Sequence, residues 1–96
     1  MLNLSHEQFA KCLNQTFRIS HEDNDHETQL IEVNKLGPAD REGGREPFSL
    51  LFRGAGDLEL PQGVYKVAHD DLEAGEIFLV PLGPGKEGML YEAVFN

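Results

Sequence analysis

Apolar and polar residues alternate over much of the chain after residue 16, and this pattern predicts β-strands. Six strands are expected, at residues 16–20, 28–36, 47–53, 63–69, 76–82 and 89–95. The segments between them lack a helical period, so the strands are expected to pair antiparallel. The predicted fold is mainly β (α+β), either a six-stranded antiparallel barrel or a two-layer sandwich, in a single domain over residues 1–96. We favour the barrel, because closure leaves no unpaired strand edges.

The run from Pro47 to Gly54 is the most apolar and best bounded of these strands, and we expect it at the centre of the sheet. Its alternation assigns Phe48, Leu50 and Phe52 to the core. Strand 76–82 is apolar on both faces, which predicts that both faces are covered.

The N-terminal segment predicts one short helix at about residues 5–14. Ser5 and Gln8 have the spacing of a capping box, which marks a helix start. Three apolar side chains then form one stripe: Phe9, Cys12 and Leu13. Because so short a helix is marginal alone, we expect it to pack over one end of the sheet.

The 96 residues include 17 acidic and 8 basic side chains, for a net charge of −9. An acidic surface repels phosphate backbones, so we do not expect nucleic-acid binding. No apolar run approaches the ~20 residues needed to cross a bilayer, and the N-terminus does not read as a signal peptide, so no membrane association is expected. The single cysteine, Cys12, has no partner for an internal disulfide, which favours a cytoplasmic protein.

Four segments of the second half carry distinctive motifs in a fixed order. They read P-F-S-L-L-F-R-G from Pro47, L-P-Q-G-V-Y from Leu60, F-L-V-P-L-G from Phe78 and Y-E-A-V-F-N from Tyr91. These motifs resemble those of a bacterial family of short, uncharacterised proteins, a domain of unknown function. The resemblance supplies no activity and no catalytic residues. Because members of that family are encoded beside tail-collar-like proteins, it implies an accessory role in a phage-tail-like assembly, with a tail-collar-like protein as the partner.

The polar stretch 21–27 contains two histidines and four carboxylates, which are side chains that bind zinc or calcium. The candidate ligands are His21, Asp23, Asp25 and His26. The stretch lacks the glycine and the final glutamate of a calcium loop, and no helix sets the histidine spacing. We interpret it as a solvated hairpin turn and expect no metal and no other cofactor.

The sequence His69-Asp70-Asp71 has the residue types of a general base with orienting carboxylates. No nucleophile has a suitable setting, because Ser49 lies in a strand and Cys12 lies on the apolar stripe of the helix. We interpret this histidine as the end of a strand that runs into an acidic turn, and we favour a protein that is not an enzyme.

Three arginines are candidates for contact with a partner: Arg53, Arg41 and Arg45. Arg53 ends the central strand, and we expect it to pair with Asp57, Glu59 or a turn carbonyl. The other two lie in the glycine-rich, charged loop 37–46.

The first hypothesis is therefore a non-enzymatic protein-binding or structural module that engages its partner through a sheet edge or the loop 37–46. One alternative is a small metal-binding protein or enzyme that uses the 21–27 cluster. Another is an acidic antagonist of a basic protein, which the net charge permits.

Overall fold

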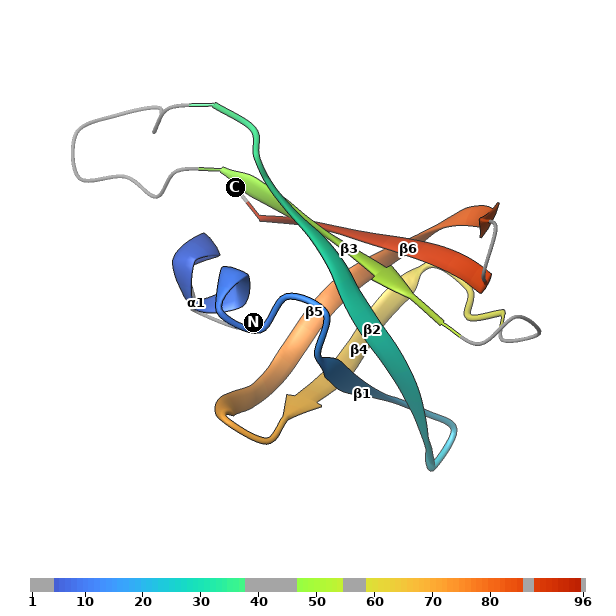
Figure 1. Cartoon of the computed structure of the whole chain (residues 1–96). Helices are drawn as coiled ribbons and strands as arrows, with labels where there is room; N and C mark the ends of the chain where they lie inside the picture. The colour runs from blue at the N-terminus through green and yellow to red at the C-terminus, as the bar shows by residue number, and fades with distance from the viewer. Residues whose placement is uncertain (1–4, 38–46, 55–58, 86–87, 96) are drawn as a thin grey trace.

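The computed structural model describes residues 5–37, 47–54, 59–85 and 88–95, and it describes only the backbone of Glu73. The elements are α1 (His6–Ala10), β1 (Thr16–His21), β2 (Asn24–Lys35), β3 (Phe48–Arg53), β4 (Gly63–His69), β5 (Leu72–Gly85) and β6 (Gly88–Phe95). The six strands close into an antiparallel barrel in the order β1-β2-β3-β6-β5-β4 (Figure 1). The predicted mainly-β fold with one short helix is confirmed, and its architecture is the barrel rather than the sandwich.

The barrel consists of two three-stranded meanders, β1-β2-β3 and β4-β5-β6, which are joined along two seams. One seam pairs β3 with β6 over the whole strand, from Phe48 opposite Phe95 to Arg53 opposite Leu90. The other pairs β1 with β4 over a shorter stretch, centred on Ile19 opposite Val67. Every strand therefore has two partners, and docking of a partner protein through a sheet edge stays a prediction.

The hairpin turns are tighter than the sequence pattern predicted. β2 begins at Asn24 rather than at residue 28, and β5 runs from Leu72 to Gly85 rather than from 76 to 82. The β1–β2 turn consists of Glu22 and Asp23, whose φ angles of 51° and 65° suit a two-residue hairpin turn. The polar residues that the pattern assigned to turns lie instead at the exposed ends of β2 and β5. Water hydrates their side chains there, while their backbone groups still pair with the neighbouring strand.

The helix is shorter than predicted, although its start is confirmed. The Ser5 hydroxyl accepts the Gln8 backbone N–H, and the Gln8 side chain accepts the Ser5 N–H at 2.9 Å. Beyond α1, Asn14, with φ 69°, donates its N–H to the Leu30 carbonyl at 2.6 Å, which directs the chain toward β2. Phe9 and Cys12 are buried, but Leu13, the third member of the expected stripe, is 41 % exposed.

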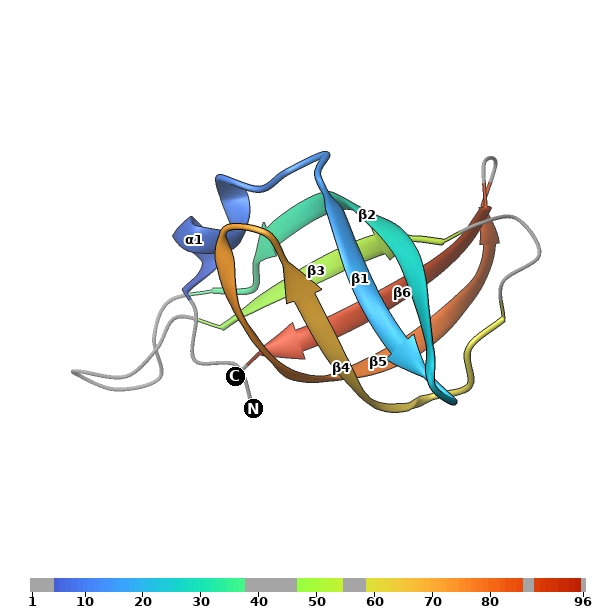
Figure 2. The same ribbon diagram turned by 90° about the horizontal axis from the view of Figure 1, so that it is seen from below.

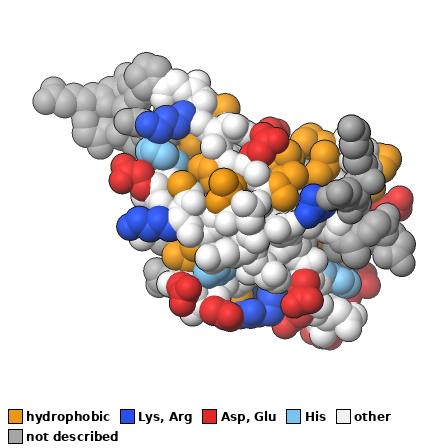
Figure 3. All heavy atoms as spheres, in the orientation of Figure 1, with side chains coloured by type: hydrophobic (Ala, Val, Ile, Leu, Met, Phe, Trp, Pro, Cys, Tyr) orange, Lys and Arg blue, Asp and Glu red, His pale blue; other side chains and the backbone are white. Residues whose placement is uncertain are grey.

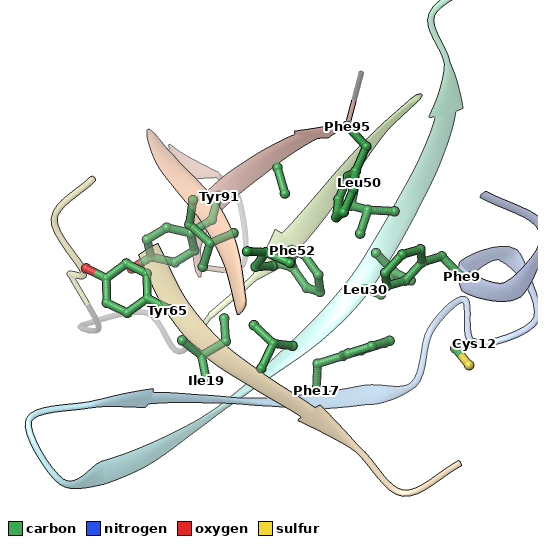
Figure 4. Close-up of a cluster of buried hydrophobic side chains, with 14 of the residues drawn as sticks. Phe9, Cys12, Phe17, Ile19, Leu30, Leu50, Phe52, Tyr65, Tyr91 and Phe95 are labelled. Atoms are coloured by element: carbon green, nitrogen blue, oxygen red, sulfur yellow. The ribbon is translucent and has the colours of Figure 1, made fainter. Parts of the chain in front are cut away.

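α1 covers one end of the barrel (Figure 2), which agrees with the expected packing of the helix. Phe9 projects from it toward Phe48 and Phe95, at ring-centroid distances of 5.9 and 5.6 Å. The rest of the core comes from inward positions on all six strands (Figure 4). Its largest fully buried side chains on the strands are Phe17, Ile19, Leu30, Phe48, Leu50, Phe52, Ile77, Leu79 and Tyr91.

A β-bulge in β2 changes which side chains face the core. Pairing with β3 skips Ile31, because Leu30 lies opposite Phe52 and Val33 lies opposite Leu50. Strict alternation would place Leu30 and Val33 on opposite faces, but both pack against the core. The even alternation expected across this strand is therefore wrong beyond residue 30.

Candidate functional site

Apolar side chains cover part of the outer surface of the barrel across β3, β6, β5 and β4. We call this surface the outer face, and it consists of Leu51, Val64, Phe78, Val80, Leu82, Leu90, Glu92 and Val94. Four of its side chains are about half exposed: Val64 at 57 %, Leu82 at 53 %, Val94 at 48 % and Phe78 at 40 %. Hydrophobic side chains gather over β6 and the adjoining end of β5 (Figure 3).

The strand register explains how these residues share one surface. Val64 lies directly opposite Phe78 in the β4–β5 ladder, so the two side chains point to the same side of the sheet. Val80 lies opposite Glu92 in the β5–β6 ladder, and Glu92 lies opposite Leu51 in the β3–β6 ladder. The outer face is therefore produced by long-range pairing, because its members are scattered over more than forty positions of the chain.

The prediction that strand 76–82 is covered on both faces is wrong for its outer face. Ile77 and Leu79 point inward and are buried. Phe78 and Leu82 point outward, and among the described residues neither is covered by another element. Exposed apolar side chains that cluster on one surface are typical of sites where another protein binds.

Glu92 is the single charged member of the outer face, and it is half-buried. Apolar residues lie opposite it on both sides, Val80 on β5 and Leu51 on β3. Within the part of the chain that the structure describes, its carboxylate accepts no side-chain hydrogen bond and forms no ion pair.

Arg53 borders this surface and is held by a neighbouring strand. It donates a hydrogen bond to the Gln29 side chain, its register partner on β2. Asp57, which was one of the carboxylates expected to pair with it, lies outside the described residues, as do Arg41 and Arg45. The structure thus gives Arg53 a role in joining β3 to β2 that the sequence analysis did not predict.

The histidines and carboxylates of the 21–27 stretch are distributed over two faces of a hairpin. The four candidate metal ligands are His21, Asp23, Asp25 and His26. His26 pairs with Ile19, whose side chain is in the core, whereas Asp25 pairs with Ser20 on the outward side and accepts its hydroxyl at 2.7 Å. The His21 ring packs edge-on against Tyr65, with centroids 5.5 Å apart. Among the described residues no three His, Cys, Asp or Glu side chains converge to hold a metal ion.

A polar hollow of about 430 Å³ lies where β1 meets the β4–β5 turn, and His69 is one of the residues that line it. Nδ1 of His69 accepts the Asp71 backbone N–H at 3.0 Å, so Nε2 carries the ring proton and donates it to Gln15 Oε1 at 2.6 Å. Arg18 is paired with Asp70 at 3.1 Å across the same hollow. Both ring nitrogens are therefore engaged in structural hydrogen bonds, and neither is available as a general base.

A second hollow, of about 350 Å³, adjoins it and contains Cys12. Burial raises the pKa of the Cys12 thiol above its usual value of 9.0, and the nearby Asp71 carboxylate raises it further. A thiol in this state is a poor nucleophile. Ser49 is buried within β3. Among the described residues, the first hollow is lined by no cysteine or serine, and the carboxylate beside Cys12 in the second disfavours the reactive thiolate, so the geometry offers no support for the catalytic alternative.

Sequence analysis missed the outer face as a site. The one sequence signal for it is that strand 76–82 is apolar on both faces, a pattern that also predicts a strand covered on both faces. The other members lie on β3, β4 and β6, and only the order of the strands in the barrel brings them beside β5.

Among the described residues, no helix combines the length and the apolar character needed to cross a membrane. Comparison with curated proteins and with solved structures gave no match. The model of one protein family, described as a domain of unknown function (DUF6916), matches residues 4–95. That match extends over both meanders and α1, and the chain therefore belongs to this family of domains of unknown function.

Proposed function

We propose that this protein is a non-enzymatic protein-binding module that docks on its partner through the outer face. The observation that carries the proposal is the group of four half-exposed apolar side chains, on three neighbouring strands of a closed barrel. Fully burying a Val, Leu or Phe side chain stabilises a complex by about 1.5–3 kcal/mol, and these four are about half exposed, so each offers roughly half of that.

The barrel suits this role because each of its strands is paired with two neighbours. A partner cannot add a strand to a closed ring, so recognition proceeds through side chains on a preformed surface. Such a surface orders little on binding and therefore loses little conformational entropy. The loop 37–46, which was the other expected site, lies outside the described residues apart from Gly37.

The family resemblance supports a narrower form of the proposal, in which the partner is a tail-collar-like protein of a phage-tail-like assembly. The unpaired Cys12 suits a reducing compartment, so we propose that the protein acts in the bacterial cytoplasm.

The test is titration of isotope-labelled protein with a tail-collar-like protein, followed by NMR. We expect amide shifts to concentrate on β4, β5 and β6. The double variant Val64→Ser/Phe78→Ser should bind at least about tenfold more weakly, because two apolar anchors are lost. Leu13→Ser is the matched control, since Leu13 is equally exposed but lies beyond α1, and it should bind like the wild type.

Shifts confined to another surface would overturn the outer face as the docking site, and no binding at all would remove the tail-collar-like protein as partner. Salt separates this proposal from the acidic-antagonist alternative. Apolar docking persists at high salt, whereas binding driven by the net charge of −9 is lost.

A further inference from the structure

The position of Glu92 restricts which proteins can occupy the outer face. Its register partners on both sides, Val80 and Leu51, are apolar. Any partner that covers these two side chains also covers the carboxylate between them. A buried carboxylate is strongly unfavourable unless the partner supplies compensating donors.

The described residues offer Glu92 no such compensation. Lys66, a cation on the same side of the barrel, lies on β4 opposite Glu76, with β5 between it and β6. Arg53 lies on β3 opposite Leu90 and donates to Gln29 on the far side of its strand. Neither cation is paired with Glu92 in the structure, which leaves the carboxylate to pair with a cation of the partner.

We propose that the outer face selects a protein whose contact surface is apolar and carries one lysine or arginine at its centre, placed to pair with Glu92. This inference rests on the proposed function and specifies the chemistry of the partner. A hydrogen bond between two opposite charges is about twice as strong as a neutral one, and it strengthens where water is excluded. The net charge of −9 also favours the approach of a basic partner over an acidic one.

The same residue argues against a second copy of this chain as the occupant. In a two-fold dimer the same surface is used by both copies, so a shared outer face would bring two Glu92 carboxylates into one apolar interface. Two chains that each carry a charge of −9 also repel one another. Glu92 therefore keeps an exposed apolar surface from closing on itself while leaving it open to a basic partner.

The experiment uses a random library of twelve-residue peptides displayed on phage as the probe, selected on the full-length protein. Peptides that also bind the Val64→Ser/Phe78→Ser variant are removed by counter-selection. Those that remain are synthesised, and their dissociation constants are measured for the wild type, Glu92→Gln and Glu92→Lys. Glu27→Gln is the matched control, because it removes a carboxylate from β2 outside the outer face.

We expect the selected peptides to combine apolar residues with a lysine or arginine. Their affinity should fall about tenfold for Glu92→Gln and further for Glu92→Lys, and it should stay unchanged for Glu27→Gln. Apolar peptides without a cation, bound equally by Glu92→Gln, would overturn this inference and leave the proposed function standing. If selection yields no peptide whose binding depends on Val64 and Phe78, the proposed function itself is overturned.

Sedimentation of the same variants tests the second part of the inference. We expect the wild type to remain monomeric and Glu92→Val to self-associate. A wild-type dimer that Phe78→Ser dissociates would show that a second copy occupies the outer face, and it would overturn the assignment of a basic partner.

Discussion

The backbone N–H of Leu60 donates a hydrogen bond of 3.0 Å to the phenolic oxygen of Tyr91, thirty-one positions further along the chain. This bond links the segment before β4 to β6, and β5 lies between these two strands in the barrel. Tyr65 makes a related contact, because its hydroxyl donates to the Pro61 carbonyl. The two tyrosines lie at the same end of the core (Figure 4). Their hydrogen bonds hold the L-P-Q-G segment against the barrel, which gives a physical reason for the motifs that contain them.

We expect Tyr91→Phe to destabilise the fold by about 1–3 kcal/mol, because the buried Leu60 N–H loses its acceptor. Urea unfolding followed by circular dichroism measures this change. Tyr65→Phe is the comparison: Pro61 is exposed, so water replaces the lost donor and the cost should be only about 0.5–1.5 kcal/mol. Equal costs for the two variants would contradict the assigned roles.

Stability should decline at alkaline pH. Burial raises the pKa of Tyr91 and of Tyr65 above the usual value of 10.0, and burial likewise raises the pKa of Cys12 above 9.0. A group whose pKa is higher in the folded state stabilises the fold fully below its unfolded pKa and loses that contribution as the pH rises through its folded pKa. The urea midpoint should therefore be constant up to about pH 9 and fall above it.

Tyr91→Phe removes one of these groups, so the decline should be shallower in that variant than in the wild type. A midpoint that is independent of pH up to about 11 would contradict the raised pKa values.

Gly88→Ala should destabilise the barrel by more than about 3 kcal/mol, which is the upper end of the cost of a strained backbone position alone. Gly88 has φ 144°, and an added Cβ would overlap the Gly54 carbonyl oxygen. Gly83→Ala is the matched control, because Gly83 also has a positive φ of 106° but has open space around it, so it should cost only about 1–2 kcal/mol. Thermal unfolding of both variants makes the comparison, and similar melting temperatures would show that the overlap is relieved.

Phe52→Ala should cost about 3–5 kcal/mol, the penalty for truncating a large buried side chain. Phe52 is fully buried and packs edge-on against Phe17, with ring centroids 5.5 Å apart. Phe78→Ala, on the outer face, should change the free energy of unfolding by no more than about 0.5 kcal/mol. Chemical denaturation measures the free energy of unfolding of both variants and so distinguishes a core residue from a surface residue. A large loss of stability for Phe78→Ala would mean that Phe78 stabilises the fold rather than a complex.

Local patterns predicted the parts of the fold that depend on neighbours in the chain. The spacing of Ser5 and Gln8 predicted the helix start, and alternation in β3 predicted the inward positions of Phe48, Leu50 and Phe52. The same alternation failed where one residue was inserted, at Ile31, because a bulge shifts the faces without leaving a mark in the sequence.

The candidate ligand and catalytic residues show that closeness in sequence does not place side chains together in space. The histidines and carboxylates of the 21–27 stretch are close in sequence, but the β1–β2 ladder turns neighbouring residues to opposite faces. His69 is followed by two aspartates in sequence, yet neither carboxylate orients its ring. The ring nitrogens are hydrogen-bonded to the Asp71 backbone N–H and to the side chain of Gln15, fifty-four positions away.

By itself, then, the sequence determined the number of strands, the helix cap and the core positions of β3, because each depends on period and on residues a few positions apart. Tertiary structure alone decided that the ring closes through β3–β6 and β1–β4, since strand order depends on pairing between distant segments. The same pairing placed Glu92 between Val80 and Leu51 and brought Val64 beside Phe78. The outer face is a product of that closure.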